Sequence, residues 1–178
     1  MRSGLILPYK DTAPHLDPTV FLAPGSVVVG DVHIGAGSSV WFNAVVRGDV
    51  FHVRIGARVN IQDLSMVHVT NGACATTIDD DVTVGHRVVL HGCHIERCCL
   101  IGMGAIIMDR AHIGHHCIIG AGSLVTEGTR IEPFTLAMGV PARPIRALRP
   151  EEIAEIEAAP GRYNTYAAHY LEAGIGTV

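Results

Sequence analysis

The sequence predicts an all-β domain of short repeated strands, followed by a helical segment. Three observations support this fold class. Helical 3.6-residue periodicity is hard to find between residues 20 and 140, aliphatic residues recur there every six residues, and a helical pattern begins only after a proline-rich exit. A chain of 178 residues is long enough for one domain with a substantial core and a small appendage.

The six-residue ladder is nearly continuous, and a glycine often follows its aliphatic residue directly, as at Gly35, Gly56 and Gly85. Spacings of nine between Val46 and Ile55, and of eleven between Val67 and Ile78 and between Leu90 and Ile101, predict loops of three, five and five extra residues. The ladder consists of Leu22, Val28, Ile34, Val40, Val46, Ile55, Ile61, Val67, Ile78, Val84, Leu90, Ile101, Ile107, Ile113, Ile119, Val125 and Ile131.

This pattern resembles the hexapeptide-repeat family, and the resemblance covers about two-thirds of the chain. It implies a left-handed parallel β-helix, in which three short strands close each triangular coil and the aliphatic residue points inward. The alternative, a sandwich of ordinary strands, needs turn signals every 8 to 12 residues and gives no reason for a strict period of six. We therefore expect a β-helix domain over residues 1–148.

Residues 149–178 are expected to form a helical appendage that packs against the outside of the coils. The exit GVPARPIRALRP carries three prolines, and acidic residues at the start of the next segment and Gly174 near its end are typical of helix boundaries. Pro160 and Gly161 predict a break that divides this helix into two pieces.

Composition excludes several classes of protein. The formal charge is −4 and no block of Lys or Arg occurs, which argues against binding to nucleic acid or to an anionic membrane. The short apolar tract near the N-terminus is broken by Pro8, so we expect neither a signal peptide nor a membrane span. We therefore expect a cytoplasmic protein. The five cysteines, an odd number, are expected to be reduced thiols, mostly buried in the core.

Counting along the ladder assigns outward residues to faces, because side chains alternate along a strand. Val46, Val67 and Leu90 fall on one face, so the residues that follow them, Arg47, His68 and His91, form one outward column. Neighbours in such a column are separated by roughly 4.8 Å.

His86 is the second residue after Val84, on the adjoining face. Counting repeats places Asp63 at the equivalent position one coil earlier and Asp109 at the equivalent position one coil later. His68 and His91 can converge on one metal ion, whereas a triangular coil turns His86 away from them. If all three bind one ion, His86 must come from a neighbouring chain, which predicts a threefold assembly. The alternative is that they are ordinary surface histidines, since the chain contains eleven histidines.

Four motifs sharpen the resemblance to the γ-class carbonic anhydrases: VRGD at 46–49, NIQD at 60–63, the histidine at 68, and VTVGHRVVLHGC at 82–93. The resemblance implies that His68, His86 and His91 bind zinc, or iron or cobalt in its place, between the subunits of a homotrimer.

The same resemblance assigns roles to other residues. It implies an ion pair between Arg47 and Asp49 near the subunit interface, and a Gln62 side chain that touches solvent bound to the metal. Asn60 and Asp63 match family positions with orienting or structural roles. Tyr170 corresponds to an aromatic hydroxyl on the terminal helix.

The implied activity is reversible hydration of CO2 to bicarbonate. A loop that carries glutamate for proton export in the prototype enzymes matches VTNGACATT at 69–77, which has no Asp or Glu, so weak activity is expected. Two other classes stay open. The exit GVPARP at 139–144 also occurs in acyl-CoA-dependent acyltransferases of the hexapeptide-repeat family, and some γ-class relatives are non-catalytic scaffolds.

Overall fold

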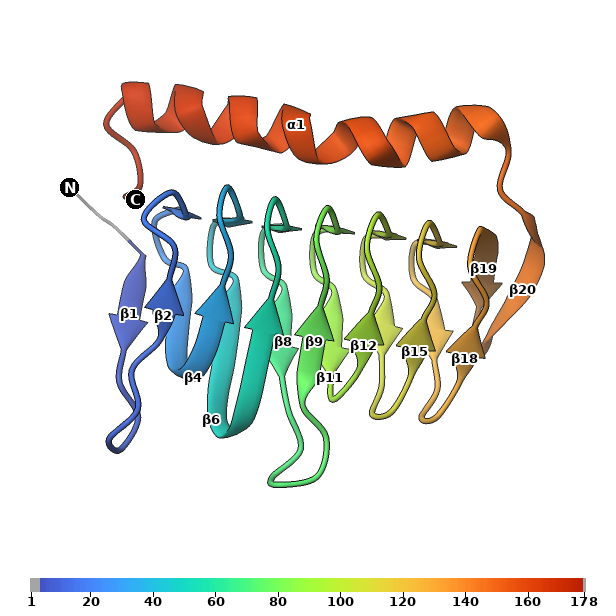
Figure 1. The fold of residues 1–178 in the computed structure, drawn as a ribbon, viewed down its shortest axis with the longest axis horizontal. Coiled ribbons are helices and arrows are strands. Elements are labelled where there is room, and N and C mark those ends of the chain that lie inside the picture. The colour runs from blue at the N-terminus through green and yellow to red at the C-terminus, as the bar shows by residue number, and fades with distance from the viewer. Residues whose placement is uncertain (1–3, 178) are drawn as a thin grey trace.

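The computed structural model describes residues 4–177 as a stack of coils with three faces, with one long helix lying along the stack (Figure 1). The strands are short and pair with their counterparts one coil away in parallel, and β19 and β20 pair antiparallel. This confirms the parallel β-helix that the period of six predicts.

The first face is formed by β1 (Leu5–Leu7), the first parts of β4 (Val27–Ile34) and β6 (Val45–Ile55), β8 (Met66–His68), β11 (Val89–His91), β14 (Ile106–Ile107) and β17 (Leu124–Val125).

The second face is formed by β3 (Phe21–Leu22), β5 (Ser39–Val40), β7 (Asn60–Ile61), β10 (Thr83–Val84), β13 (Leu100–Ile101), β16 (Ile118–Ile119), β19 (Thr135–Gly139) and β20 (Ala142–Ala147).

The third face is formed by β2 (His15–Leu16), the remaining parts of β4 and β6, β9 (Thr76–Ile78), β12 (His94–Ile95), β15 (His112–Ile113) and β18 (Arg130–Ile131).

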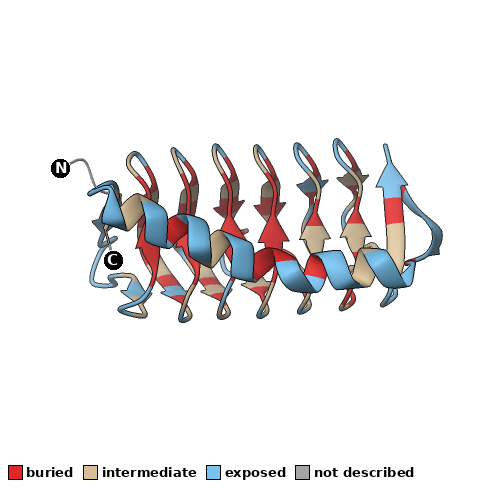
Figure 2. Cartoon of the chain, turned by 90° about the horizontal axis from the view of Figure 1, so that it is seen from above, coloured by how far each residue is buried: buried red, intermediate tan, exposed pale blue. Residues whose placement is uncertain are grey.

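The core is the inward ladder. Every aliphatic residue of the six-residue ladder has at most 5% of its surface exposed, and these residues belong to one continuous cluster (Figure 2). Glycines after the ladder let successive coils approach closely. At Gly85, a Cβ would lie 2.9 Å from the Ile101 carbonyl oxygen and 2.9 Å from the Met103 nitrogen, both backbone atoms of the next coil. Cys93, Cys99 and Cys117 also belong to the core cluster, and no cysteine of the described chain forms a disulfide.

The loops agree with two of the three predicted insertions. Extra residues follow Val46 within β6, and a longer loop follows β8, from which it extends away from the stack (Figure 1). The prediction of a third insertion, between Leu90 and Ile101, is wrong. Ile95 lies on the third face between them and pairs with Ile78 and Ile113, so a shortened repeat of five residues is followed by one of six.

This shortened repeat changes the face assignment further along the chain. Val84 pairs with Ile101, and Ile107 follows Leu90 on the first face. Asp109 therefore does not continue the column of His86, as the count predicted. It lies one coil beyond His91 instead.

The helix α1 (Pro150–Glu172) runs back along the stack and packs on β5 and β10 of the second face (Figure 1). After it, Thr177 exchanges two backbone hydrogen bonds with Leu22 in β3. Of the predicted domain ranges 1–148 and 149–178, residues 1–3 and 178 lie outside the described part of the chain.

The predicted break at Pro160 and Gly161 is wrong, because α1 is one continuous helix. Pro160 is buried, and Ile156, Ala159 and Ala167 are the other buried residues of this helix. Packing of this face on the coils holds both halves in line, which offsets the cost of about 3 kcal/mol that a proline carries inside a helix. In residues 4–177 no helix is long and apolar enough to span a bilayer.

Candidate metal centre

His68 and His91 lie side by side on the first face. Their Cα atoms are partners in the pairing of β8 with β11, and their ring centroids are 5.2 Å apart. Val67 and Leu90 point into the core, and the histidines that follow them therefore point outward. His68 Nδ1 lies 3.3 Å from His91 Nε2.

Each of these imidazoles is held by a carboxylate on its other nitrogen. His68 Nε2 lies 3.0 Å from Asp49 Oδ1, and His91 Nδ1 lies 2.6 Å from Asp109 Oδ1. The Thr70 hydroxyl, in the loop after β8, donates to the second oxygen of Asp109 at 2.6 Å. These contacts fix both rings and leave His68 Nδ1 and His91 Nε2 facing each other.

The facing nitrogens fit a shared metal ion. A carboxylate only accepts hydrogen bonds, so each neutral ring presents an N–H to its carboxylate and a lone pair toward the other ring. Two lone pairs at 3.3 Å repel unless a cation lies between them. Zn–N bonds of about 2.0–2.1 Å at a tetrahedral angle place two ligand nitrogens roughly 3.3–3.4 Å apart, which agrees with the observed separation.

The carboxylates are themselves stabilised as anions. Burial by itself would raise the pKa of Asp49. Hydrogen bonds from His68 and Arg47 have the opposite and larger combined effect, so the pKa of Asp49 lies below its usual range. The pKa of Asp109 is lowered in the same way, where hydrogen bonds from Thr70 and His91 outweigh burial. Anionic carboxylates orient the imidazoles and increase their basicity toward a metal.

His86 lies at the corner that follows β10, where Arg87 takes a φ of +59°. His86 Nδ1 is 2.8 Å from Asp63 Oδ2, and Asp63 occupies the equivalent corner one coil earlier, as the count predicted. This contact leaves Nε2 as the nitrogen that can bind a cation. The His86 side chain is 44% exposed, so it can reach a partner outside its own chain.

Arg47 and Asp49 form the ion pair that the resemblance implies, with Arg47 Nη1 2.6 Å from Asp49 Oδ2. Asp49 therefore bridges Arg47 and His68. The Arg47 side chain is 39% exposed, and we assign it no energetic contribution beyond positioning Asp49, because exposed ion pairs stabilise little.

Gln62 is buried on the second face, next to the corner that carries Asp63 and His86. The Gln62 amide donates to Asn60 Oδ1 at 3.0 Å, and the Asn60 amide donates to the Thr83 hydroxyl at 2.9 Å. The pKa of Tyr163 in α1 is raised, chiefly by burial, and the Gln62 side chain opposes this shift. Asn60 thus orients Gln62 on the His86 side of the chain.

Tyr170 belongs to an aromatic cluster between α1 and the second face. Its ring centroid lies 5.5 Å from that of Trp41, 5.5 Å from that of Phe42 and 6.2 Å from that of Phe21. Tyr170, Phe42 and His86 line one pocket of about 410 Å³, hereafter the helix pocket. The helix therefore brings Tyr170 to the same cavity as His86.

The structure divides the predicted ligands as the sequence does, with His68 and His91 together and His86 on another face. Within residues 4–177 of a single chain, no group of three or more His, Cys, Asp and Glu side chains is arranged to hold a metal ion. The count missed Asp109 as the partner of His91. A repeat of five residues at Ile95 is the signal that would have found it, because it moves Ile107 to the first face.

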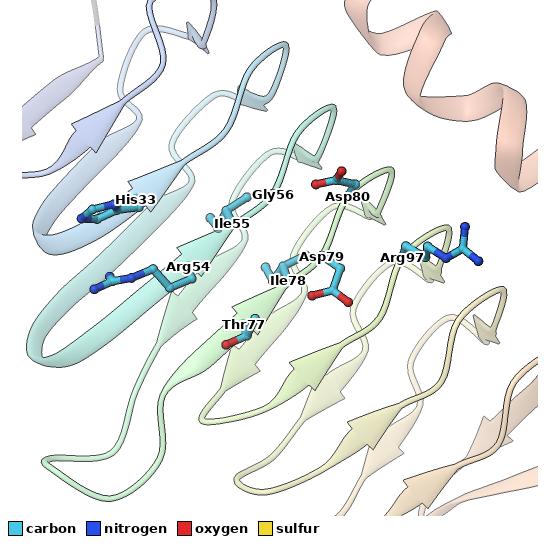
Figure 3. A pocket seen from close by; sticks show the side chains of 9 residues that line it. All are labelled: His33, Arg54, Ile55, Gly56, Thr77, Ile78, Asp79, Asp80 and Arg97. Atoms are coloured by element: carbon cyan, nitrogen blue, oxygen red, sulfur yellow. The ribbon is translucent and has the colours of Figure 1, made fainter.

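Two other histidines stack on the surface, and each hydrogen-bonds a carboxylate. His94 and His112 stack on the third face with centroids 4.9 Å apart, but each directs Nε2 to a carboxylate, Asp79 and Glu96 respectively. A hollow of about 490 Å³ on the same face is lined by Arg54, Asp79 and Asp80 among others, and thus has charges of both signs (Figure 3). Neither feature resembles the facing nitrogens of His68 and His91.

Comparisons with known proteins agree with this fold. The model of the bacterial transferase hexapeptide, with six repeats, matches residues 92–127. A carbonic anhydrase of Geobacillus kaustophilus is 46% identical over 166 residues, which cover 93% of this chain and 91% of that protein. The mitochondrial gamma carbonic anhydrase 1 of Arabidopsis thaliana is 45% identical over 96% of this chain, which spans 64% of that protein.

Among solved structures, a hexapeptide transferase family protein from Anaplasma phagocytophilum superimposes with a TM-score of 0.90. It is 36% identical, and the match covers 96% of this chain and 99% of that one. The fold and these matches define a hexapeptide-repeat protein. More particularly, the chain belongs to the γ-class carbonic anhydrase family.

Proposed function

We propose that this protein is a metal-dependent enzyme that reversibly hydrates CO2 to bicarbonate. The observation that carries the proposal is the pair of imidazole nitrogens, His68 Nδ1 and His91 Nε2, 3.3 Å apart with a carboxylate behind each ring. The family relationship supports the same conclusion, since the Geobacillus kaustophilus relative is named a carbonic anhydrase.

His68 and His91 of one subunit and His86 of the next would hold the metal, which we propose to be zinc, with iron or cobalt able to replace it. A divalent ion held by three neutral nitrogens lowers the pKa of water to about 7 and so supplies a hydroxide nucleophile at neutral pH. Asp49, Asp109 and Asp63 keep the three rings in the required orientation through the contacts described above.

Gln62 and Tyr170 are proposed to act on the substrate side of the site. The Gln62 amide is fixed by Asn60 and has limited freedom, which suits a group that orients a reacting water. Tyr170 is carried on a helix anchored by aromatic packing and lines the helix pocket together with His86. Arg47 contributes by holding Asp49 against His68.

A homotrimer is proposed because the metal site is incomplete in one chain. An outward apolar stripe also runs along the first face, one residue before the ladder, in register from coil to coil. A subunit interface would bury this stripe, which lies beside His68 and His91. It consists of Val27, Val45, Met66, Val89, Ile106 and Leu124.

Acyl transfer is the second candidate, because the Anaplasma phagocytophilum neighbour is described as a member of a hexapeptide transferase family. A single general base does not require two imidazoles with facing nitrogens and a carboxylate behind each. A non-catalytic scaffold is the third candidate, and it would need no defined proton path.

Metal analysis and rate measurements on the purified protein test the proposal. Protein prepared without chelator or air should contain about one divalent ion per chain, sediment as a trimer and hydrate CO2 in a stopped-flow assay. A monomer that keeps its full metal content would contradict the shared site. Metal-loaded trimer without hydration would favour the scaffold, and turnover of acyl-CoA would favour the transferase.

Asp109→Asn should weaken metal binding about 10- to 100-fold, because His91 loses the anionic partner that orients its ring and increases its basicity. The dissociation constant is measured by competition with a chromogenic chelator. Asp79→Asn is the matched control, since Asp79 makes the same kind of contact with His94 on the third face. Equal affinities for the two variants would contradict the role of Asp109.

A further inference from the structure

Proton export is a requirement of the proposed reaction. Hydration of CO2 by water yields bicarbonate and one proton, and the proton must leave the site before the next turnover. The loop between β8 and β9 contains no carboxylate, and its exposed residues include Asn71, Gly72 and Ala73. A proton acceptor must therefore lie elsewhere.

The helix pocket brings the metal ligand His86 and a second imidazole, His169, to one cavity. A volume of about 410 Å³ has room for several waters, each of which occupies about 30 Å³ in the liquid. Waters in such a cavity can carry a proton between two groups that do not touch. The titratable groups that line it are Asp63, His86, Tyr163, Tyr166, His169 and Tyr170.

Among these groups, the chemistry of the side chains leaves His169 as the proton acceptor. Asp63 is occupied by its contact with His86 Nδ1. Phenols ionise near pH 10 and hold their protons at neutral pH, and burial raises the pKa of Tyr163 further. An imidazole is the side chain that gains and loses a proton near neutral pH, which is the requirement for an efficient acceptor.

The position of His169 also suits release of the proton. His169 is exposed on the last turns of α1, so buffer can reach its ring. Its neighbours in sequence hold this part of the helix in place, since Ala167 is buried and Tyr170 packs against Trp41 and Phe42. The ring is thus accessible from both the pocket and the solvent.

We infer that His169 is the proton acceptor of this protein and takes the place of the missing acidic loop. The inference rests on the proposed CO2 hydration. The neutral ring of His169 accepts the proton through water in the helix pocket, becomes an imidazolium, and returns to the neutral form when buffer removes the proton.

The kinetic test is His169→Ala in metal-loaded protein at low buffer concentration. Proton export follows the release of bicarbonate, so kcat should fall about 10²-fold while kcat/KM for CO2 stays unchanged. Added imidazole should restore kcat. A purely structural role of His169 would lower both parameters without rescue.

His52→Ala is the matched comparison, because His52 lines a different pocket together with Asp49, the partner of His68. A fall in kcat with imidazole rescue in His52→Ala, and not in His169→Ala, would overturn the assignment. If metal-loaded parent protein shows no hydration, the proposed function fails and this inference with it. Hydration that is unaffected by His169→Ala overturns the inference alone.

A readout without catalysis uses cobalt in place of zinc. Paramagnetic Co²⁺ should shift the NMR signals of the His169 ring, assigned by their absence in His169→Ala, because this ring shares a pocket with His86. The signals of His94 and His112 on the third face should shift far less. A His169 ring that shows no shift would place it away from the metal and overturn the inference.

Discussion

His86→Ala should abolish metal retention while the chain stays folded. The imidazole is exposed and belongs to no core cluster, so its removal leaves the inward ladder intact. Two remaining nitrogens, from His68 and His91, are one fewer than a catalytic zinc site uses. The loss of affinity should exceed the roughly 10- to 100-fold that removal of a ligand's hydrogen-bonding partner causes.

The measurement is metal content per chain after gel filtration, together with circular dichroism and the unfolding midpoint. His94→Ala is a close control, because His94 also contacts an aspartate and its side chain is 41% exposed, against 44% for His86. The control should keep its metal. An unchanged metal content in His86→Ala would remove this residue from the site and with it the main argument for a shared site.

Ile101→Ala should lower the free energy of unfolding by about 2–5 kcal/mol. Ile101 is fully buried, and its strand β13 pairs with β10 on one side and β16 on the other. Truncation therefore leaves a cavity in the middle of the stack, where closely stacked coils cannot relax to fill it. In a repeat fold each coil depends on its neighbours, so the defect also weakens the adjoining coils.

Urea denaturation at fixed protein concentration measures this change. Ile145→Ala provides the same chemical change at a residue that is 56% exposed on β20, and it should alter stability by no more than about 0.5 kcal/mol. Similar losses in both variants would contradict the view that the inward ladder dominates stability.

The period of six in the amino-acid sequence is sufficient to predict the β-helix and its inward ladder. A strict period of six with alternating side chains leaves few ways to bury Val67 and Leu90 and direct His68 and His91 outward. The division between this pair and His86 followed from the same counting, because residues at equal positions in successive coils must stack. These inferences depend on local geometry that repeats from coil to coil.

Features that depend on exact register and on packing between distant segments could not be predicted from this period. A repeat of five residues at Ile95 moved Asp109 beside His91, since the additional strand at Ile95 shifts every later residue by one face. Burial against the coils kept α1 continuous through Pro160, where local propensity predicted a break. The same packing brought His169 and Tyr170 to the pocket of His86, because the position of a helix on a stack is set by the surfaces that meet.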